Sequence, residues 1–156
     1  MWAVIGFVTI VSVIFFGDLY IKNRVEKYIP AGGNGKSERK LLGGRLLLRR
    51  HHNRGMALNA GEKKQPAVAA VSLVLTAVVT VVFIISLGRR GNHLLRTGLA
   101  LLLGGAFSNT YDRLKRKYVV DYLSFGVKWK GLRKIVFNLS DLCILIGALL
   151  AALGAA

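Results

Sequence analysis

Acidic residues are scarce in this chain: seven Asp and Glu stand against 23 Lys and Arg, giving a formal net charge of +16. Cysteine is rarer still, and the single Cys143 excludes an intrachain disulfide. A motif that would explain the charge through nucleic acid is also missing. We therefore expect no nucleic-acid partner and predict that anionic membrane lipids are the electrostatic partner of the basic residues.

Hydrophobic residues make up 53% of the 156 residues, and a soluble domain of this size rarely combines that share with so high a charge. They gather in four blocks, residues 2–16, 67–87, 94–107 and 139–156. Blocks of about 20 apolar residues span a bilayer, and lipid without hydrogen-bonding groups forces them to be helical. The first block lacks a basic leader and a cleavage site, so we expect it to be retained. The sequence predicts an all-α membrane protein with four transmembrane helices in a single domain, 1–156.

Two polar stretches, residues 18–66 and 110–138, separate the first from the second helix and the third from the fourth. Residues 30–35 are turn-rich, and 46–48 are either a short strand or an interfacial piece. Residues 119–125 alternate and are rich in β-formers. We expect a small β-containing region between helices 1 and 2 and before helix 4. Four spans put both stretches on one side of the membrane.

The charge distribution bears on which side of the membrane the two polar stretches occupy. The two polar stretches hold 20 of the 23 basic residues, which the positive-inside rule would place in the cytoplasm. The orientation of the chain in the membrane must therefore be judged from the function of the polar residues in these stretches.

Two aspartates, Asp121 and Asp141, lie where apolar and basic segments meet. An ionisable group at bilayer depth is costly, so it predicts function. Two carboxylates brought together share one proton, which is the chemistry of an aspartic protease. Asp141 begins the last predicted helix, whose N-terminus favours its anion. Our hypothesis is that Asp141 holds the charge and Asp121 the proton, as one coupled pair.

Five short motifs follow one another at the predicted helix boundaries. They are Asp18-x-x-x-Lys22, Asn53-x-Gly55-x-Ala57, Gly104-Gly105-Ala106-Phe107-Ser108-Asn109 continuing to Asp112-Arg113, Val119-Val120-Asp121-Tyr122, and Phe137-Asn138-Leu139-Ser140-Asp141. In this order, over nearly the whole chain, they resemble bacterial signal peptidase II, the lipoprotein signal peptidase family. Ile21, Ser108 and Ser140 depart from the family pattern, which has a hydroxyl residue, a glycine and an alanine there. None of these departures removes a carboxylate.

The resemblance implies an intramembrane aspartic endopeptidase that removes the signal peptide from diacylglyceryl-modified prolipoproteins, just before the lipid-modified cysteine. It implies a bacterial cytoplasmic membrane location, with the active site on the extracytoplasmic side, and no metal or organic cofactor. We expect the chain to act as a monomer. Asp121 and Asp141 are the implied catalytic pair. The implied binding and support residues are Asp18, Lys22, Asn53, Gly55, Gly105, Asn109, Asp112, Arg113 and Asn138.

Other interpretations stay open at this point. The chain is alternatively a non-catalytic lipid- or peptide-binding membrane protein that resembles the peptidase, or a small transporter subunit with proton-relaying aspartates. Asp18 and Lys22 alone predict an i,i+4 ion pair, and Asn138 alone predicts a helix cap. Adjacent His51 and His52 diverge in a helix or a strand, so we predict no metal site there.

Overall fold

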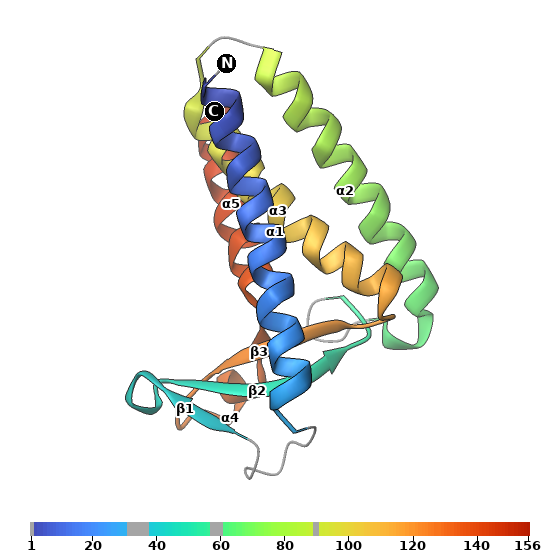
Figure 1. The fold of residues 1–156 in the computed structure, drawn as a ribbon, viewed down its shortest axis with the longest axis vertical. Coiled ribbons are helices and arrows are strands. Elements are labelled where there is room, and N and C mark those ends of the chain that lie inside the picture. The colour runs from blue at the N-terminus through green and yellow to red at the C-terminus, as the bar shows by residue number, and fades with distance from the viewer. Residues whose placement is uncertain (1, 31–37, 57–60, 89–90) are drawn as a thin grey trace.

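A computed structural model describes residues 2–30, 38–56, 61–88 and 91–156 of the chain. Its principal elements are four long helices and a small four-stranded sheet. Figure 1 shows both termini at one end of the helices and the sheet at the other. Within the sequence motifs, Ala57 and most of the turn-rich segment 30–35 lie outside the described residues.

The long helices are α1 (Trp2–Tyr28), α2 (Gln65–Gly88), α3 (His93–Lys115) and α5 (Leu139–Ala155). The predicted bounds of α2 and α5 are confirmed within two residues, whereas the predicted ends of α1 and α3 are wrong. Gly17 does not end α1; the helix stops before Pro30, whose ring disfavours helical backbone in the preceding residue. α3 likewise continues past Phe107 to Lys115.

This correction moves several predicted site residues from loops into helices. Asp18 and Lys22 lie in the second half of α1. Asn109, Asp112 and Arg113 lie in the last turns of α3. Helical backbone fixes the direction of these side chains more strictly than a loop would.

The sheet contains β1 (Arg39–Leu41), β2 (Leu46–Asn53), β3 (Val119–Phe125) and β4 (Val136–Phe137). All neighbours are antiparallel in the order β1-β2-β3-β4. The two polar stretches therefore fold into one unit, with β2 from the first paired to β3 from the second. Residues 46–48 prove to be part of a strand, and the prediction of β structure at 119–125 is confirmed. A short helix, α4 (Lys130–Lys134), precedes β4.

The first four residues of β3 are buried, so both faces of this part of the strand are covered. Val120 and Tyr122 pack against Val25 and Ile29 at the end of α1. Because side chains alternate along a strand, Asp121 points to the opposite face. The Asp121 carboxylate there accepts a hydrogen bond from Asn138, the N-cap of α5.

The helices pack closely where α3 carries glycines. A Cβ atom at Gly105 would lie 2.5 Å from the Ser140 carbonyl oxygen in α5, and one at Gly104 would lie 2.9 Å from Cβ of Ile14 in α1. The glycines of α3 therefore let atoms of α1 and α5 come close to the α3 backbone, as small residues allow in membrane helices. A core of Phe7, Phe83 and Leu99 fills the end distant from the sheet.

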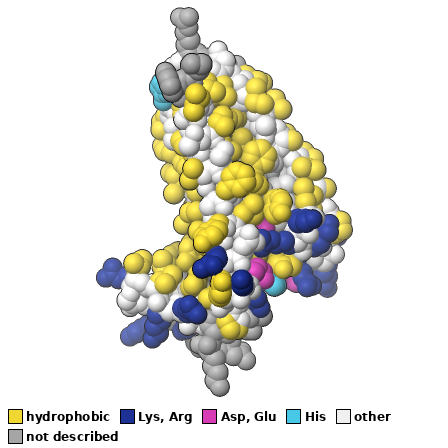
Figure 2. Space-filling model, in the orientation of Figure 1, with side chains coloured by type: hydrophobic (Ala, Val, Ile, Leu, Met, Phe, Trp, Pro, Cys, Tyr) yellow, Lys and Arg dark blue, Asp and Glu magenta, His cyan; other side chains and the backbone are white. Residues whose placement is uncertain are grey.

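The molecule exposes apolar residues and buries polar ones. Along α2 and α5, exposed side chains such as Val74, Leu75, Leu145 and Leu149 are 60–69% accessible. Figure 2 shows apolar atoms over the helices and basic side chains gathered toward the sheet end. Among the described residues, two segments are long and apolar enough to cross a membrane, Ala3–Tyr28 and Glu62–Gly88, while Leu139–Ala155 is a shorter apolar helix. This distribution suits lipid as the solvent of the helices.

Candidate active site

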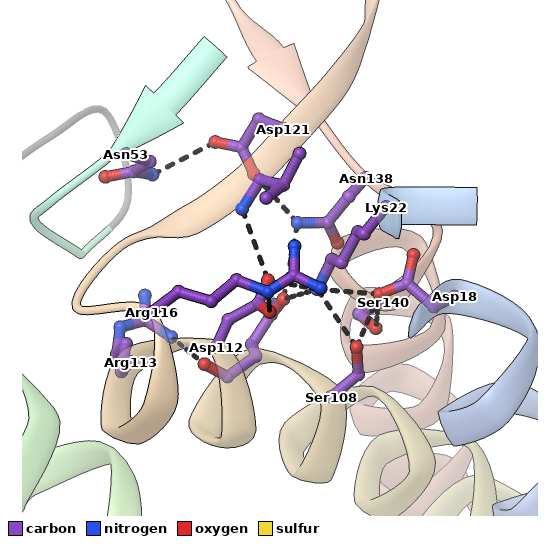
Figure 3. Close-up of polar contacts among 12 residues, drawn as sticks. Asp18, Lys22, Asn53, Ser108, Asp112, Arg113, Arg116, Asp121, Asn138 and Ser140 are labelled. Carbon is purple, nitrogen blue, oxygen red and sulfur yellow. Dashed lines mark hydrogen bonds and ion pairs between the residues drawn. The ribbon is translucent and has the colours of Figure 1, made fainter. Parts of the chain in front are cut away.

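Asp121 lies in the middle of β3, opposite His51 of β2. The pairing of the two strands shifts between Leu48 and His51, and such irregularities often redirect side chains beside active sites. Asp121 is 2% exposed. Its Oδ1 accepts a hydrogen bond from Asn138 Nδ2 at 2.8 Å, and its Oδ2 accepts one from Asn53 Nδ2 at 3.2 Å (Figure 3).

Asp141 lies in the first turn of α5, where two donors meet its carboxylate. Its Oδ1 accepts from Asn109 Nδ2 at 2.8 Å, and its Oδ2 accepts from the Asn138 backbone N–H at 3.0 Å. The Asn138 side chain in turn accepts from the Asp141 backbone N–H at 2.9 Å. This is a reciprocal capping box, which fixes the helix start and the Asp141 side chain together.

Asn138 thus holds both carboxylates, Asp121 through its side-chain amide and Asp141 through its backbone N–H. Asn138 itself is fully buried. Two carboxylates bound to one residue in this way are close neighbours in a poorly hydrated place. The prediction that Asn138 is a cap is confirmed, and the cap also links the two acids.

Both aspartates line one cavity of about 400 Å³ between the sheet and the start of α5. Asp141 also lines a cavity of about 340 Å³ between α2, α3 and α5, and Asp121 lines one of about 420 Å³ beside His51 and α4. The shared cavity has mainly apolar walls, lined by Asn53, Met56, Arg113, Val119, Asp121, Ile135, Val136, Phe137, Asp141, Ile144, Leu145 and Ala148. An apolar hollow with a few convergent polar groups is the usual form of a ligand site.

Burial first, and then the neighbouring Asp141 carboxylate, raise the pKa of Asp121 from 3.8 to about 7. The amide donors of Asn53 and Asn138 oppose the rise, because they stabilise the charged form. A carboxyl group with this pKa retains a proton near neutrality. Asp121 is therefore suited to be the protonated member of the pair.

A second polar cluster lies behind the aspartates, centred on Lys22. Its ammonium group lies 2.7 Å from Asp18 Oδ2 and 3.1 Å from Asp112 Oδ2, with all three side chains fully buried. Asp112 Oδ1 lies 3.1 Å from Arg116 Nε, and Asp112 Oδ2 accepts from the Val120 backbone N–H at 3.2 Å. The i,i+4 ion pair of Asp18 and Lys22 exists within α1 as predicted, but it is buried inside the bundle and is not a surface pair.

Arg113 connects α3 to the turn after β2. Its guanidinium donates to the carbonyl oxygen of Gly55 at 3.2 Å and to that of Asn109 at 3.4 Å. Asn53 closes the same turn, because its side-chain oxygen accepts from the Gly55 backbone N–H at 3.0 Å. The motif containing Asn53 and Gly55 therefore forms a turn and also delivers an amide to Asp121.

Three partners of Asp18 were not predicted from sequence. Ser108 and Ser140 donate to Asp18 Oδ2 at 2.6 and 2.5 Å, and the Tyr122 hydroxyl donates to Oδ1 at 2.8 Å. The two serines are the departures from the family pattern, and they come from different helices. No spacing in the sequence indicates that they share one oxygen atom, because α3 and α5 bring them together only in the fold.

The histidines take part in other contacts. His52 Nε2 lies 2.7 Å from Glu26 Oε1, and its ring stacks on Tyr118. His51 lines a cavity with Asp121. Within the ranges that the structure describes, no cluster of three or more His, Cys, Asp or Glu side chains is arranged to hold a metal ion.

The sequence of this chain matches a known protein family. Residues 10–155 match the sequence model of the family described as signal peptidase (SPase) II. The chain belongs to the signal peptidase II family.

Curated relatives agree with this membership. The lipoprotein signal peptidase of Mesorhizobium japonicum is 34% identical over 85% of this chain and 74% of its own length, and that of Histophilus somni strain 2336 is 31% identical over 96% and 87%. The match to the lipoprotein signal peptidase of Clostridium tetani, 31% identical, spans 63% of this chain and only 61% of that relative. The predicted family is therefore confirmed.

Solved structures show the same fold. A bacterial membrane enzyme determined by the in meso method at 2.3 Å resolution superposes with a TM-score of 0.79 at 18% identity, covering 96% of this chain and 87% of that one. A second, at 1.9 Å resolution, gives a TM-score of 0.74 at 17% identity, with 96% and 92% covered. As a signal peptidase II family member, the chain is a membrane protein of a peptidase family.

Proposed function

We propose that this chain is a lipoprotein signal peptidase of the aspartic type, which cuts diacylglyceryl-modified prolipoproteins just before the lipid-modified cysteine. Family membership supports the substrate class. The observation that carries the aspartic mechanism is that Asn138 binds both Asp121 and Asp141 at one cavity. Two carboxylates that share a proton supply both the base and the acid that peptide hydrolysis requires.

In this mechanism Asp141 is the ionised member. It accepts two N–H donors and lies at the N-terminus of α5, and both features stabilise an anion. It removes a proton from water as that water attacks the scissile carbonyl. Asp121, protonated at rest, supplies the proton that the leaving amine requires.

The signal peptide is proposed to enter from the lipid between α2 and the bundle. The cavity there contains Asp141 and has apolar walls including Leu75, Val79, Leu102 and Ile144. Such walls suit the apolar core of a signal peptide or an acyl chain. Four spans, with the sheet and the aspartates at the extracytoplasmic end, would give an exported substrate access to the pair.

The non-catalytic alternative depended on the departures at Ile21, Ser108 and Ser140, and the last two bring hydroxyl groups into the buried polar cluster. Both hydroxyls bind Asp18, and neither is among the residues lining the cavity that Asp121 and Asp141 share. They therefore leave the space in front of the aspartates open. This geometry favours the enzyme over a binding protein.

The test is cleavage of a lipidated prolipoprotein by the purified protein in detergent. Asp121→Asn and Asp141→Asn are each expected to abolish turnover, a loss of at least about 10²–10⁴-fold, because each removes one half of the acid–base pair. Glu38→Gln is the matched control, since Glu38 pairs with Arg49 and Arg133 on the sheet. Substantial turnover by either aspartate variant would overturn the mechanism, and no turnover by the unmodified chain would overturn the activity.

A further inference from the structure

The Lys22 ammonium group contacts oxygen atoms of four side chains in α1 and α3. Besides Asp18 and Asp112, it donates to Ser108 Oγ at 2.9 Å (Figure 3). It also donates to Asn109 Oδ1 at 2.9 Å. The Lys22 side chain is fully buried, so a substrate cannot touch it. Any effect of Lys22 on the reaction must therefore pass through one of these partners or through the electric field of its charge, which acts to lower the pKa of Asp121.

Asn109 is the partner that reaches the candidate catalytic pair. Its Nδ2 donates a hydrogen bond to Asp141 Oδ1 at 2.8 Å. Its Oδ1 accepts hydrogen bonds from the Lys22 ammonium group and, at 3.3 Å, from Asn138 Nδ2. An ammonium group has only donors. If the amide of Asn109 were reversed, its NH₂ would face the Lys22 ammonium and its oxygen would face the Asp141 carboxylate. Lys22 therefore permits only the orientation in which Asn109 donates to Asp141.

The groups around Lys22 keep it in place. Asp18 and Asp112 are the buried charges on its side, the partly exposed Arg116 pairs with Asp112, and Ser108, Ser140 and Tyr122 donate hydrogen bonds to Asp18. On the side of the aspartates, the charged groups are Asp121 from β3, Arg113 from α3 and Asp141 from α5. Lys22 is thus held on one side by Asp18, and its hydrogen bond toward the catalytic side is the one it donates to Asn109.

We propose that Lys22 is a positioning residue that sets the amide orientation of Asn109 and thereby the hydrogen bond that Asn109 gives to Asp141. This inference rests on the proposed function and extends it to a group that never meets the substrate. Loss of that orientation is expected to act mainly on kcat, with KM unchanged, because Lys22 lines neither the cavity that the aspartates share nor the one proposed for signal-peptide entry.

The experiment uses the full chain in detergent with the lipidated prolipoprotein. Lys22→Met alone would strand the buried Asp18 carboxylate, so it is combined with Asp18→Asn, which removes both charges together. This double variant is expected to lose about 10- to 100-fold in kcat, as for a lost hydrogen bond to a charged group. Asn109→Ala, which leaves the ion pair intact, is expected to lose a similar factor.

A mutant cycle tests the route of the effect. In the Asn109→Ala background, adding Asp18→Asn and Lys22→Met should cause little further loss in kcat, since the partner that transmits the effect is already missing. Arg96→Met is the matched control for removing a buried cation. Arg96 donates to the Ser86 carbonyl at the other end of α3, so its loss is expected to lower thermal stability and keep kcat.

The outcomes separate the two proposals. Cleavage by the unmodified chain together with wild-type kcat in the Asp18→Asn/Lys22→Met variant would overturn the inference and leave the proposed function intact. Multiplicative losses in the cycle, or a loss expressed in KM, would overturn it as well. Absence of cleavage by the unmodified chain would remove the proposed function and the inference with it.

Discussion

At the scale of single residues, Asn138 combines two roles that are usually separate. As the N-cap of α5 it satisfies backbone donors, and as an amide donor it holds Asp121 beside Asp141. A helix start is a rigid place, so a carboxylate fixed by its cap has little freedom to move. The position of the acid pair therefore depends on the same contacts that begin the last helix.

Asn138→Ala is expected to lower both stability and activity. The lost cap costs about 0.5–2 kcal/mol in the free energy of unfolding, and the lost donor to Asp121 should reduce kcat by about tenfold or more. Thermal unfolding and the cleavage assay measure the two effects. Asn92→Ala removes the corresponding cap of α3, where Asn92 accepts from the Leu95 N–H at 3.0 Å, and should affect stability alone. Equal kcat losses in both variants would show that Asn138 acts only as a cap.

The raised pKa of Asp121 predicts the pH dependence of cleavage. If Asp121 must carry the proton, kcat/KM should fall as the pH rises through about 7. Measuring initial rates with the lipidated substrate on both sides of that pH checks the prediction. A rate that rises steadily above it would contradict the assignment of the proton to Asp121.

The same shift predicts a pH effect on stability. Between pH 3.8 and about 7 the unfolded chain releases the Asp121 proton while the folded chain retains it, so the free energy of unfolding falls with rising pH. Asp121→Asn removes this loss, and its stability relative to wild type should therefore be higher above pH 7 than below pH 4. Unfolding experiments on both proteins at these two pH values give the difference. A difference that is the same at both would contradict the prediction.

At the scale of elements, close helix packing brings the polar clusters together. α3 and α5 approach through glycines on both sides: a Cβ atom at Gly147 would lie 2.5 Å from the Leu102 nitrogen and 2.6 Å from the Gly98 oxygen. The same approach brings Ser108 of α3 and Ser140 of α5 to one oxygen of Asp18. Larger residues at this contact would separate the groups that bind Asp18.

Gly147→Ala is expected to destabilise the protein by about 1–3 kcal/mol, because the new methyl group meets backbone atoms that cannot move aside easily. Thermal unfolding in detergent measures this. Gly6→Ala is the control, since a Cβ atom at Gly6 in α1 would have no neighbour within 4 Å and alanine favours helix. A Gly147→Ala protein as stable as Gly6→Ala would show that α3 and α5 are not held at this distance.

The extended ends of α1 and α3 explain why the element boundaries were predicted incorrectly. A hydropathy argument ends a membrane helix where the charged residues begin, at Asp18 and after Phe107. Those charges are neutralised by each other inside the bundle, so the helix continues through them. The pairing of Lys22 with Asp112 joins two helices that are far apart in sequence, and sequence reasoning cannot evaluate that contact.

At the scale of the whole molecule, the basic residues and the aspartates share the sheet end, while both termini lie at the other. Charge counting places that end in the cytoplasm, and the proposed exported substrate requires it outside. Arg49, Arg50, Arg116 and Arg133 each lie beside an acid, with Glu38 shared by Arg49 and Arg133. These pairs do not change the number of basic residues that the positive-inside rule counts, so a labelling experiment must decide the orientation.

Cysteine labelling tests the orientation. In a Cys143→Ala background, Trp129→Cys at the sheet end should react with an impermeant thiol reagent on intact cells, since Trp129 is 70% exposed. His93→Cys at the start of α3 should react only after lysis. The reverse pattern would place the aspartates in the cytoplasm and contradict the proposed access of exported prolipoproteins.

The sequence by itself determined the family, the positions of the apolar helices and the presence of β structure around residue 121. These follow from local composition and from motifs whose residues are near each other in the chain. It also indicated Asp121 and Asp141 as a pair, from their places where apolar and basic segments meet and from the family resemblance.

Tertiary structure alone decided how the polar residues are connected. Asn138 between the two acids, Lys22 behind Asn109, and two serines on one oxygen of Asp18 all join groups from different elements. Their free energy depends on burial and on partners distant in sequence, because a charge or amide is stable in a membrane bundle only when a specific neighbour satisfies it. Local sequence does not specify that neighbour; the packing of α1, α3, α5 and the sheet does.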